Sequence, residues 1–226
     1  MKSDIQIRED VLEEIRWDPQ LTKIAPQIGV SVKDEVVTLS GSVDYYYQRV
    51  AAENAAQRIA GVKVVAVDIN VKGGETADAT TDSTIALAIR NALTWHSGVN
   101  EDMIDIKVDN GWVYLDGSVQ WDYERKAAER AIENLKGVKG IINRVKVKPK
   151  NAEPSDIKKK ISAAFHRSAT VDAANISVSV NGNEVELTGR VRSWAERQQA
   201  EEVALRIPGI ATVRNRLEID SEILAD

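Results

Sequence analysis

The chain has 226 residues, of which 43% are hydrophobic and 29% charged, with 30 basic and 35 acidic side chains and no cysteine. The net charge of −5 argues against nucleic acid as a partner, because binding to a duplex rests mainly on Lys and Arg neutralising phosphates. The lack of cysteine excludes disulfides, and no apolar run reaches the length of a signal peptide or of a bilayer span. The sequence therefore predicts a soluble chain without a transmembrane segment, cytoplasmic as written.

Pairs of glycines recur along the chain with a constant spacing within each pair. Twenty residues separate the two members of each pair, which are Gly41 and Gly61, Gly117 and Gly137, and Gly189 and Gly209. A fixed internal period indicates one folding unit copied three times. We predict domains over residues 4–72, 82–148 and 156–220, with exposed polar linkers at 73–81 and 149–155. Units this small are marginal alone, so we expect them to lean on one another.

Each unit begins with the pattern of a short amphipathic helix followed by a β-hairpin. The apolar helix positions are Ile7, Val11 and Ile15, then Ile85, Ile89 and Leu93, then Ile157, Ile161 and Phe165. Asp4, Asp82 and Asp156 stand near the start of these helices, where they could cap the helix or interact with its dipole. Two alternating runs around a short turn follow in every copy, at 28–43, 104–119 and 176–191, as a hairpin requires.

A second helix and a last strand complete each unit. The second helices are predicted over roughly 46–60, 122–136 and 194–207, each with a small buried face rich in alanine, and the later glycine of each pair suits a left-handed helix cap. The last strands are 65–71, 141–147 and 213–219. The predicted fold class is α+β: three tandem α-β-β-α-β units, each with two helices packed on a small mixed three-stranded sheet.

These motifs resemble the BON domain family, named after bacterial osmotic-stress and nodulation proteins. The resemblance rests on Val-x-Leu-x-Gly-x-Val, which stands at Val37–Val43, Val113–Val119 and Val185–Val191, and on the trailing pairs Gly61-Val62, Gly137-Val138 and Gly209-Ile210. It covers nearly the whole chain. It implies an α-β-β-α-β fold, a non-enzymatic role in stress or envelope physiology, contact with phospholipid, and a periplasmic location as the alternative to a cytoplasmic one.

Aromatic side chains gather where the second helix begins. Tyr45, Tyr46, Tyr47, Trp121, Tyr123 and Trp194 fall in this segment, and an arginine stands eight residues past each motif glycine, at Arg49, Arg125 and Arg197. Aromatic rings and arginine at a helix N-terminus suit lipid headgroups or a protein surface. Alternatively, the rings attach the helix to its own sheet and the arginines pair with Glu53, Glu129 and Glu201 one turn later. We interpret Trp17 and Trp95, which end the first helix in two copies, as packing residues, and the motif glycines as sites of a bulge or of close packing.

No set of residues in the sequence predicts catalysis. The histidines, His96 and His166, fall out of register with each other, and no nucleophile elbow, phosphate loop or zinc-protease helix is present. We therefore expect no enzyme, no cofactor and no metal. The first hypothesis is a triple binding module that contacts phospholipid or a protein partner through Tyr45, Tyr46, Arg49, Trp121, Tyr123, Arg125, Trp194 and Arg197. The alternative is a cytoplasmic structural or chaperone-like interaction protein, whose exposed strand edges accept a partner strand and which does not bind lipid.

Overall fold

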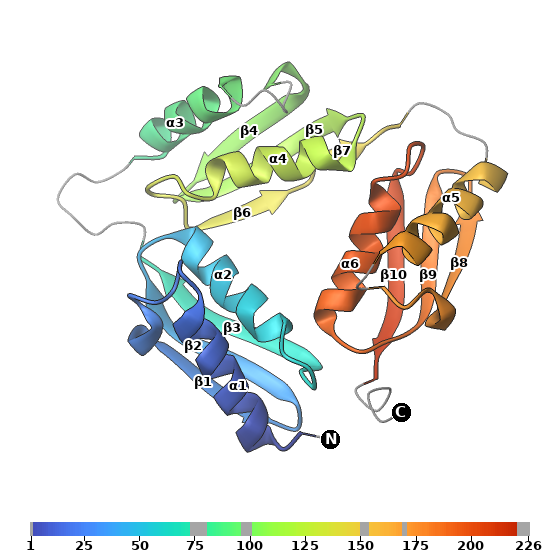
Figure 1. Cartoon of the computed structure of the whole chain (residues 1–226). Coiled ribbons are helices and arrows are strands. Elements are labelled where there is room, and N and C mark those ends of the chain that lie inside the picture. The colour runs from blue at the N-terminus through green and yellow to red at the C-terminus, as the bar shows by residue number, and fades with distance from the viewer. Residues whose placement is uncertain (1, 73–80, 96–100, 150–153, 169–170, 221–226) are drawn as a thin grey trace.

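The computed structural model describes residues 2–72, 81–95, 101–149, 154–168 and 171–220. It contains the same sequence of elements in each of three units (Figure 1), so the predicted α+β repeat is confirmed. The linker segments lie largely outside the described residues, as does His96.

The first unit shows how the sheet is built. Its elements are α1 (Asp4–Trp17), η1 (Ala25–Gln27), β1 (Ile28–Lys33), β2 (Val36–Val43), α2 (Tyr46–Gln57) and β3 (Val64–Val71). β1 pairs antiparallel with β2 as a hairpin. β3 returns after the helix and pairs parallel with β2, with Val37 opposite Val65. The sheet is therefore mixed, because a helical crossover brings the last strand back in the direction of β2.

The second and third units repeat this topology. The second consists of α3 (Asp82–Thr94), η2 (Glu101–Met103), β4 (Ile104–Asp109), β5 (Trp112–Val119), α4 (Asp122–Ile132), β6 (Gly140–Asn143) and β7 (Lys146–Val147). The third consists of α5 (Pro154–Arg167), η3 (Ala173–Asn175), β8 (Ile176–Asn181), β9 (Glu184–Val191), α6 (Trp194–Leu205) and β10 (Thr212–Ile219). In the second unit the last strand is split, since β6 and β7 both pair parallel with β5.

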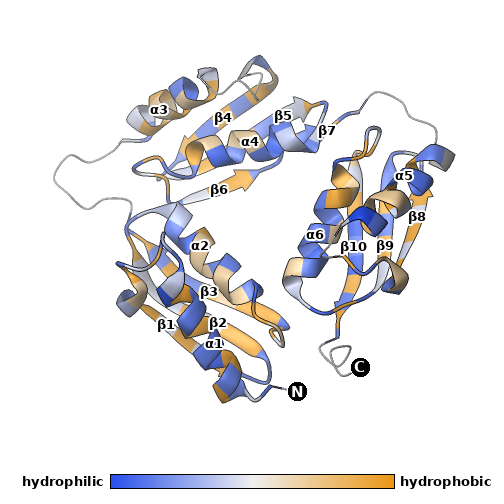
Figure 2. Cartoon of the chain, in the orientation of Figure 1, coloured by the Kyte–Doolittle hydropathy of each residue, from blue (hydrophilic) through white to orange (hydrophobic). Residues whose placement is uncertain are grey.

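The buried residues follow the sequence pattern closely. The stripe of Ile7, Val11 and Ile15 on α1 is at most 1% exposed, and the alanines of α2 are at most 7% exposed. In Figure 2 the strands of the first unit are largely hydrophobic while the helices alternate between hydrophobic and hydrophilic residues. Buried residues of the first and second units form one contiguous cluster, whereas the third unit has its own. The expectation that the units lean on one another therefore holds for the first pair.

Each motif glycine occupies a backbone position that other residues cannot adopt without strain. Gly41 has a φ of +124°, and a Cβ atom there would lie 2.1 Å from the carbonyl oxygen of Gln27. Gly117 and Gly189 have almost the same φ and the same close carbonyl, from Met103 and Asn175. The glycine lets the short 3-10 turn before the hairpin rest directly on the second strand. The structural interpretation of this motif is therefore confirmed.

Two details of the helices differ from the prediction. The caps of α1 and α3 are Ser3 and Thr81, while Asp4 accepts hydrogen bonds from the backbone N–H groups of the hairpin turn, at 2.9 Å from Asp34 and 3.1 Å from Glu35. Asp82 does the same in the second unit, whereas Asp156 stands two residues inside α5 and is not equivalent. The second helices also end earlier than expected, and the later glycines, with φ near +95°, lie in the turn beyond them.

Candidate functional site at the junctions between units

The predicted contact residues surround the N-termini of the second helices, but their environments differ. Tyr45 and Tyr47 stack with ring centroids 5.7 Å apart, and Trp121 and Tyr123 stack at 6.5 Å in the equivalent places of the second unit. Tyr45, Trp121 and Tyr123 are 38%, 36% and 57% exposed. Both ring pairs occupy the helix cap position and the second helical residue, so this local geometry follows directly from the repeat.

Tyr46 does not face solvent, because it points into the second unit. Its side chain is buried, and the backbone of Ile141 in β6 hydrogen-bonds to the phenol. Burial raises the pKa of the Tyr46 phenol above its ordinary value, and Glu129 on α4 adds to the rise. The beginning of α2 is therefore packed against the end of α4 and the start of β6. This residue connects the first unit to the second.

Trp194, at the equivalent place in the third unit, connects that unit to the first. Its indole Nε1 donates a hydrogen bond of 2.9 Å to the carbonyl oxygen of Lys63, in the turn between α2 and β3. The ring also packs against the apolar cluster shared by the first two units. The guanidinium of Arg197 lies 4.7 Å from the ring centroid on the third unit's side. A half-buried indole that donates its one polar hydrogen is a well-satisfied anchor.

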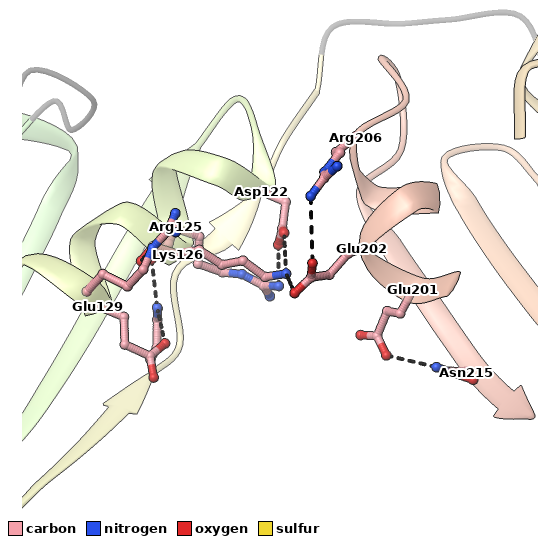
Figure 3. A network of polar contacts seen from close by, with 10 residues as sticks. Asp122, Arg125, Lys126, Glu129, Glu201, Glu202, Arg206 and Asn215 are labelled. Carbon is pink, nitrogen blue, oxygen red and sulfur yellow. Dashed lines mark hydrogen bonds and ion pairs between the residues drawn. The ribbon is translucent and has the colours of Figure 1, made fainter. Parts of the chain in front are cut away.

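The remaining junction, between the second and third units, is ionic. The equivalent residue there is Asp122, whose buried carboxylate pairs with Arg125 and Lys126 on its own helix. Lys126 also reaches across to Glu202 on α6 at 3.4 Å, and Arg206 lies 3.7 Å from the other oxygen of Glu202 (Figure 3). This junction thus has an acidic residue at the place where the other two junctions have an aromatic ring.

The three junctions connect the units into a closed circle, and every junction has the same polarity. In each case the start of a second helix lies against the later part, or the following turn, of the second helix in a neighbouring unit: α2 against α4, α4 against α6, and α6 against α2 (Figure 1). The arrangement is an approximate threefold repeat within one chain. The sequence predicted the copies, but nothing in it indicated this closure.

The arginines of the predicted site mostly serve the protein's own structure. Arg125 pairs with Asp122, and Arg197 donates to the carbonyl oxygens of Leu217 and Asn215. The expectation that these arginines pair with Glu129 and Glu201 is wrong. Both glutamates instead accept hydrogen bonds from an asparagine of the last strand, Asn143 or Asn215. Arg49 is half-buried beside Tyr46.

Two tryptophans that we interpreted as packing residues are almost fully exposed. Trp17, the last residue of α1, is 78% exposed, and Trp95, the C-cap of α3, is 87% exposed. The interpretation was wrong because the apolar stripe of each helix ends two residues earlier, at Ile15 and Leu93, and two residues along a helix bring the tryptophan to the opposite side. Their shared register at two helix ends was the signal that could have identified them.

Within the described residues, the side chains form no metal site and no helix suits a bilayer. No group of three or more His, Cys, Asp or Glu side chains is arranged to hold a metal ion. None of the described helices combines the length and the apolar character needed to cross a membrane. The side chains that the structure places at the junctions and helix ends are aromatic rings, apolar side chains and ion pairs.

The fold defines a tandem array of three small α+β domains. The chain belongs to the BON domain family, whose model matches residues 3–73, 81–149 and 154–221. It is 28% identical over 147 residues to the osmotically-inducible protein Y of Escherichia coli K12, covering 61% of this chain and 72% of that protein. It is 32% identical over 127 residues to an uncharacterized protein encoded in the gshII 5' region of Anaplasma centrale, covering 55% of this chain and 84% of that protein.

The match to a solved structure is much weaker. The C-terminal domain of CdsD, a structural protein of the type III secretion system of Chlamydia trachomatis, aligns with 97% of this chain at 15% identity and a TM-score of 0.26. So low a score says nothing about the arrangement of the units or about function.

Proposed function

We propose that this chain is a non-enzymatic, stress-related BON protein that binds a phospholipid surface, mainly through its middle unit. The similarity to an osmotically-inducible protein supports the physiological setting. One observation carries the proposal for lipid. Of the ten large hydrophobic side chains that are exposed among the described residues, six belong to the middle unit, namely Leu87, Trp95, Met103, Trp112, Trp121 and Tyr123, and none belongs to the third.

The helix α3 has the composition best suited to a lipid interface. Between Asp82 and Thr94 its only charged residues are Asp82 and Arg90, and it exposes Leu87 (54%) with Trp95 (87%) at its end. The matching helices are polar on their outer sides, α1 through several acidic residues and α5 through Lys158, Lys159 and Lys160. Tryptophan favours the boundary between headgroups and acyl chains, and exposed leucine gains from leaving water. A shallow contact by α3 follows from this asymmetry.

The aromatic segment of the second helices is a further part of this proposed surface. Tyr45, Trp121 and Tyr123 are the exposed rings available for contact. Tyr46 and Trp194 are occupied at junctions, and Arg125 and Arg197 are engaged within their own units, so we assign these four a supporting role. Arg49 stands beside Tyr46 and shares that role.

Vesicle cosedimentation tests the proposal. We expect the full chain to bind phosphatidylcholine vesicles with or without phosphatidylglycerol, and Trp95→Ala to weaken binding about ten-fold, since burial of one large apolar side chain contributes about 1.5–3 kcal/mol. The matched control is Trp17→Ala, which removes the equivalent exposed tryptophan from the acidic helix and should change binding less. No binding at low salt, or equal binding by the wild type and Trp95→Ala, would overturn the proposal.

A protein-interaction role is the second candidate, and one strand edge favours it. β3 is the edge of the first sheet and has a single charged residue, Asp68, with Val64 49% exposed. The equivalent strand β10 is charged instead, with Arg214 and Arg216 paired to glutamates of β9. A strand edge with so few charged side chains is the kind that accepts a further strand. Concentration-dependent association in sedimentation velocity, abolished by Val64→Lys, would favour this role, and a monomer at all concentrations would count against strand pairing between copies.

A further inference from the structure

The ionic junction between the second and third units contains a cavity that we propose as a binding site for an aromatic side chain next to a carboxylate in a protein partner. The cavity has a volume of about 250 Å³. Its walls are α4, from the N-cap Trp121 to Arg130 in the last turn, and the C-terminal end of α6. It is lined by Trp121, Asp122, Tyr123, Lys126, Arg130, Glu202, Leu205 and Arg206. This inference goes beyond the proposed lipid contact and does not depend on it.

The other two junctions show what kind of group this type of interface accepts. Five residues past the motif glycine, the first and third units place Tyr46 and Trp194, and each ring packs against a neighbouring unit while its polar atom hydrogen-bonds to that unit's backbone. The second unit places Asp122 there, and this carboxylate turns toward Arg125 and Lys126 of its own helix. The third junction is therefore left without an inserted ring and is open at its surface.

The apolar part of the cavity can stack with an incoming ring. Trp121 and Tyr123 form a stacked pair on one wall, both exposed, and Leu205 contributes from the other wall. Aromatic groups gain from offset stacking beyond the area that they bury. The volume suits one aromatic side chain and is below that of a drug-sized pocket.

The charges around the cavity favour an anion beside that ring. Asp122 and Glu202 are both neutralised, the first by Arg125 and Lys126 and the second by Lys126 and Arg206. Arg130 donates through Nε to the carbonyl oxygen of Lys126 and interacts electrostatically with Glu133, which leaves donors of its guanidinium for a second carboxylate. The five ionisable lining residues other than tyrosine carry a net charge of +1 in a chain of net charge −5. A carboxylate next to the inserted ring would pair with Arg130.

The test uses two probes that differ only in charge, N-acetyl-L-tryptophan and N-acetyl-L-tryptophanamide, titrated without lipid into the 15N-labelled full chain. We expect saturable shifts of backbone amide resonances at residues 121–130 and 202–206, with the carboxylate probe binding about two- to five-fold more tightly. Arg130→Ala should remove that preference while leaving the amide probe's affinity unchanged. Shifts confined to other regions, or no shifts at millimolar probe, would overturn the site.

A matched pair of variants distinguishes binding at this site from non-specific binding of the probes to exposed aromatic side chains. Tyr123→Ala should weaken binding of both probes about two- to ten-fold, because it removes one ring of the stacked wall. Tyr47→Ala removes the equivalent ring from the first unit, where the junction is already filled by the buried Tyr46, and should leave binding unchanged. Equal effects of the two substitutions would contradict the proposal, and amide spectra that otherwise match the wild type would show that both variants fold.

Discussion

Single residues at equivalent places decide how the copies differ. Tyr46, Asp122 and Trp194 share one register, yet two of them join units through a buried or half-buried ring and the third makes ion pairs within its own helix. The motif glycines behave in the opposite way, because all three have the same backbone and the same close carbonyl. Residues that maintain the fold are thus copied, while residues that determine contacts between units vary.

The motif glycine of the third unit provides the first prediction. Gly189→Ala should lower the free energy of unfolding of that unit by about 3 kcal/mol, since a φ of +127° is strained for alanine and the added Cβ would lie 2.1 Å from the carbonyl oxygen of Asn175. Gly182→Ala is the control in the same unit. Its φ of +58° is also positive but the space around it is open, so about 1 kcal/mol is expected. Urea denaturation measures both, and equal losses would show that the close carbonyl is unimportant.

At the scale of elements, the first helix is tied to the hairpin at its own start. The carboxylates of Asp4 and Asp82 each accept two hydrogen bonds from backbone N–H groups in the turn between the first two strands. These turns contain residues with positive φ, Asp34 and Glu35 in the first unit and Asn110 and Gly111 in the second. One carboxylate thereby fixes both the turn conformation and the position of the helix on the sheet.

Removing this tie should destabilise the second unit. Asp82→Ala leaves two N–H groups of the turn without their charged acceptor, and we expect a loss of about 2 kcal/mol, because hydrogen bonds to charged groups contribute about 1.5–3 kcal/mol each and part of this is recovered from water. Asp105→Ala, which changes an exposed aspartate on β4, is the control and should stay within about 0.5 kcal/mol. Thermal unfolding followed by circular dichroism measures both. If Asp82→Ala left the free energy of unfolding unchanged, the turn would keep its conformation without this carboxylate.

At the scale of the whole molecule, the three junctions differ in physical character. The first joins two units into a single apolar cluster, the second rests on the anchor of Trp194, and the third rests on Lys126 and Glu202, whose side chains are 37% and 28% exposed. Exposed ion pairs contribute little and weaken with salt. The third unit is therefore held mainly by Trp194 and by its covalent connection.

The different strengths of the three junctions predict which substitution separates the units. Trp194→Ala should increase the radius of gyration measured by small-angle X-ray scattering, and the increase should grow from 0.1 to 0.5 M salt as screening weakens the remaining ionic junction. Trp17→Ala, which removes a ring that is 78% exposed, should leave the scattering unchanged. The melting temperature of the third unit should hardly move, because its apolar cluster is separate. Scattering identical to that of the wild type would refute the role of Trp194 as an anchor.

The sequence alone determined the elements inside each unit. Alternation at 28–43, the stripe of Ile7, Val11 and Ile15, and the glycine rhythm report local geometry and burial on one face, and these depend on spacings within a single copy. The exposure of Trp17 and Trp95 and the partners of Arg125 and Arg197 were not foreseen. Each depends on which side of an element faces another segment, and spacing constrains that less.

Only the tertiary structure decided that Tyr46 and Trp194 face neighbouring units, that Asp122 leaves a cavity at the third junction, and that the copies close into a ring. The physical reason is the scale of the interactions involved. Burying the core of each unit contributes a large free energy, and the same apolar positions do this in all three copies, so the repeat in the sequence reveals them. The packing of one copy against another depends on only a few side chains, at positions that the fold does not constrain.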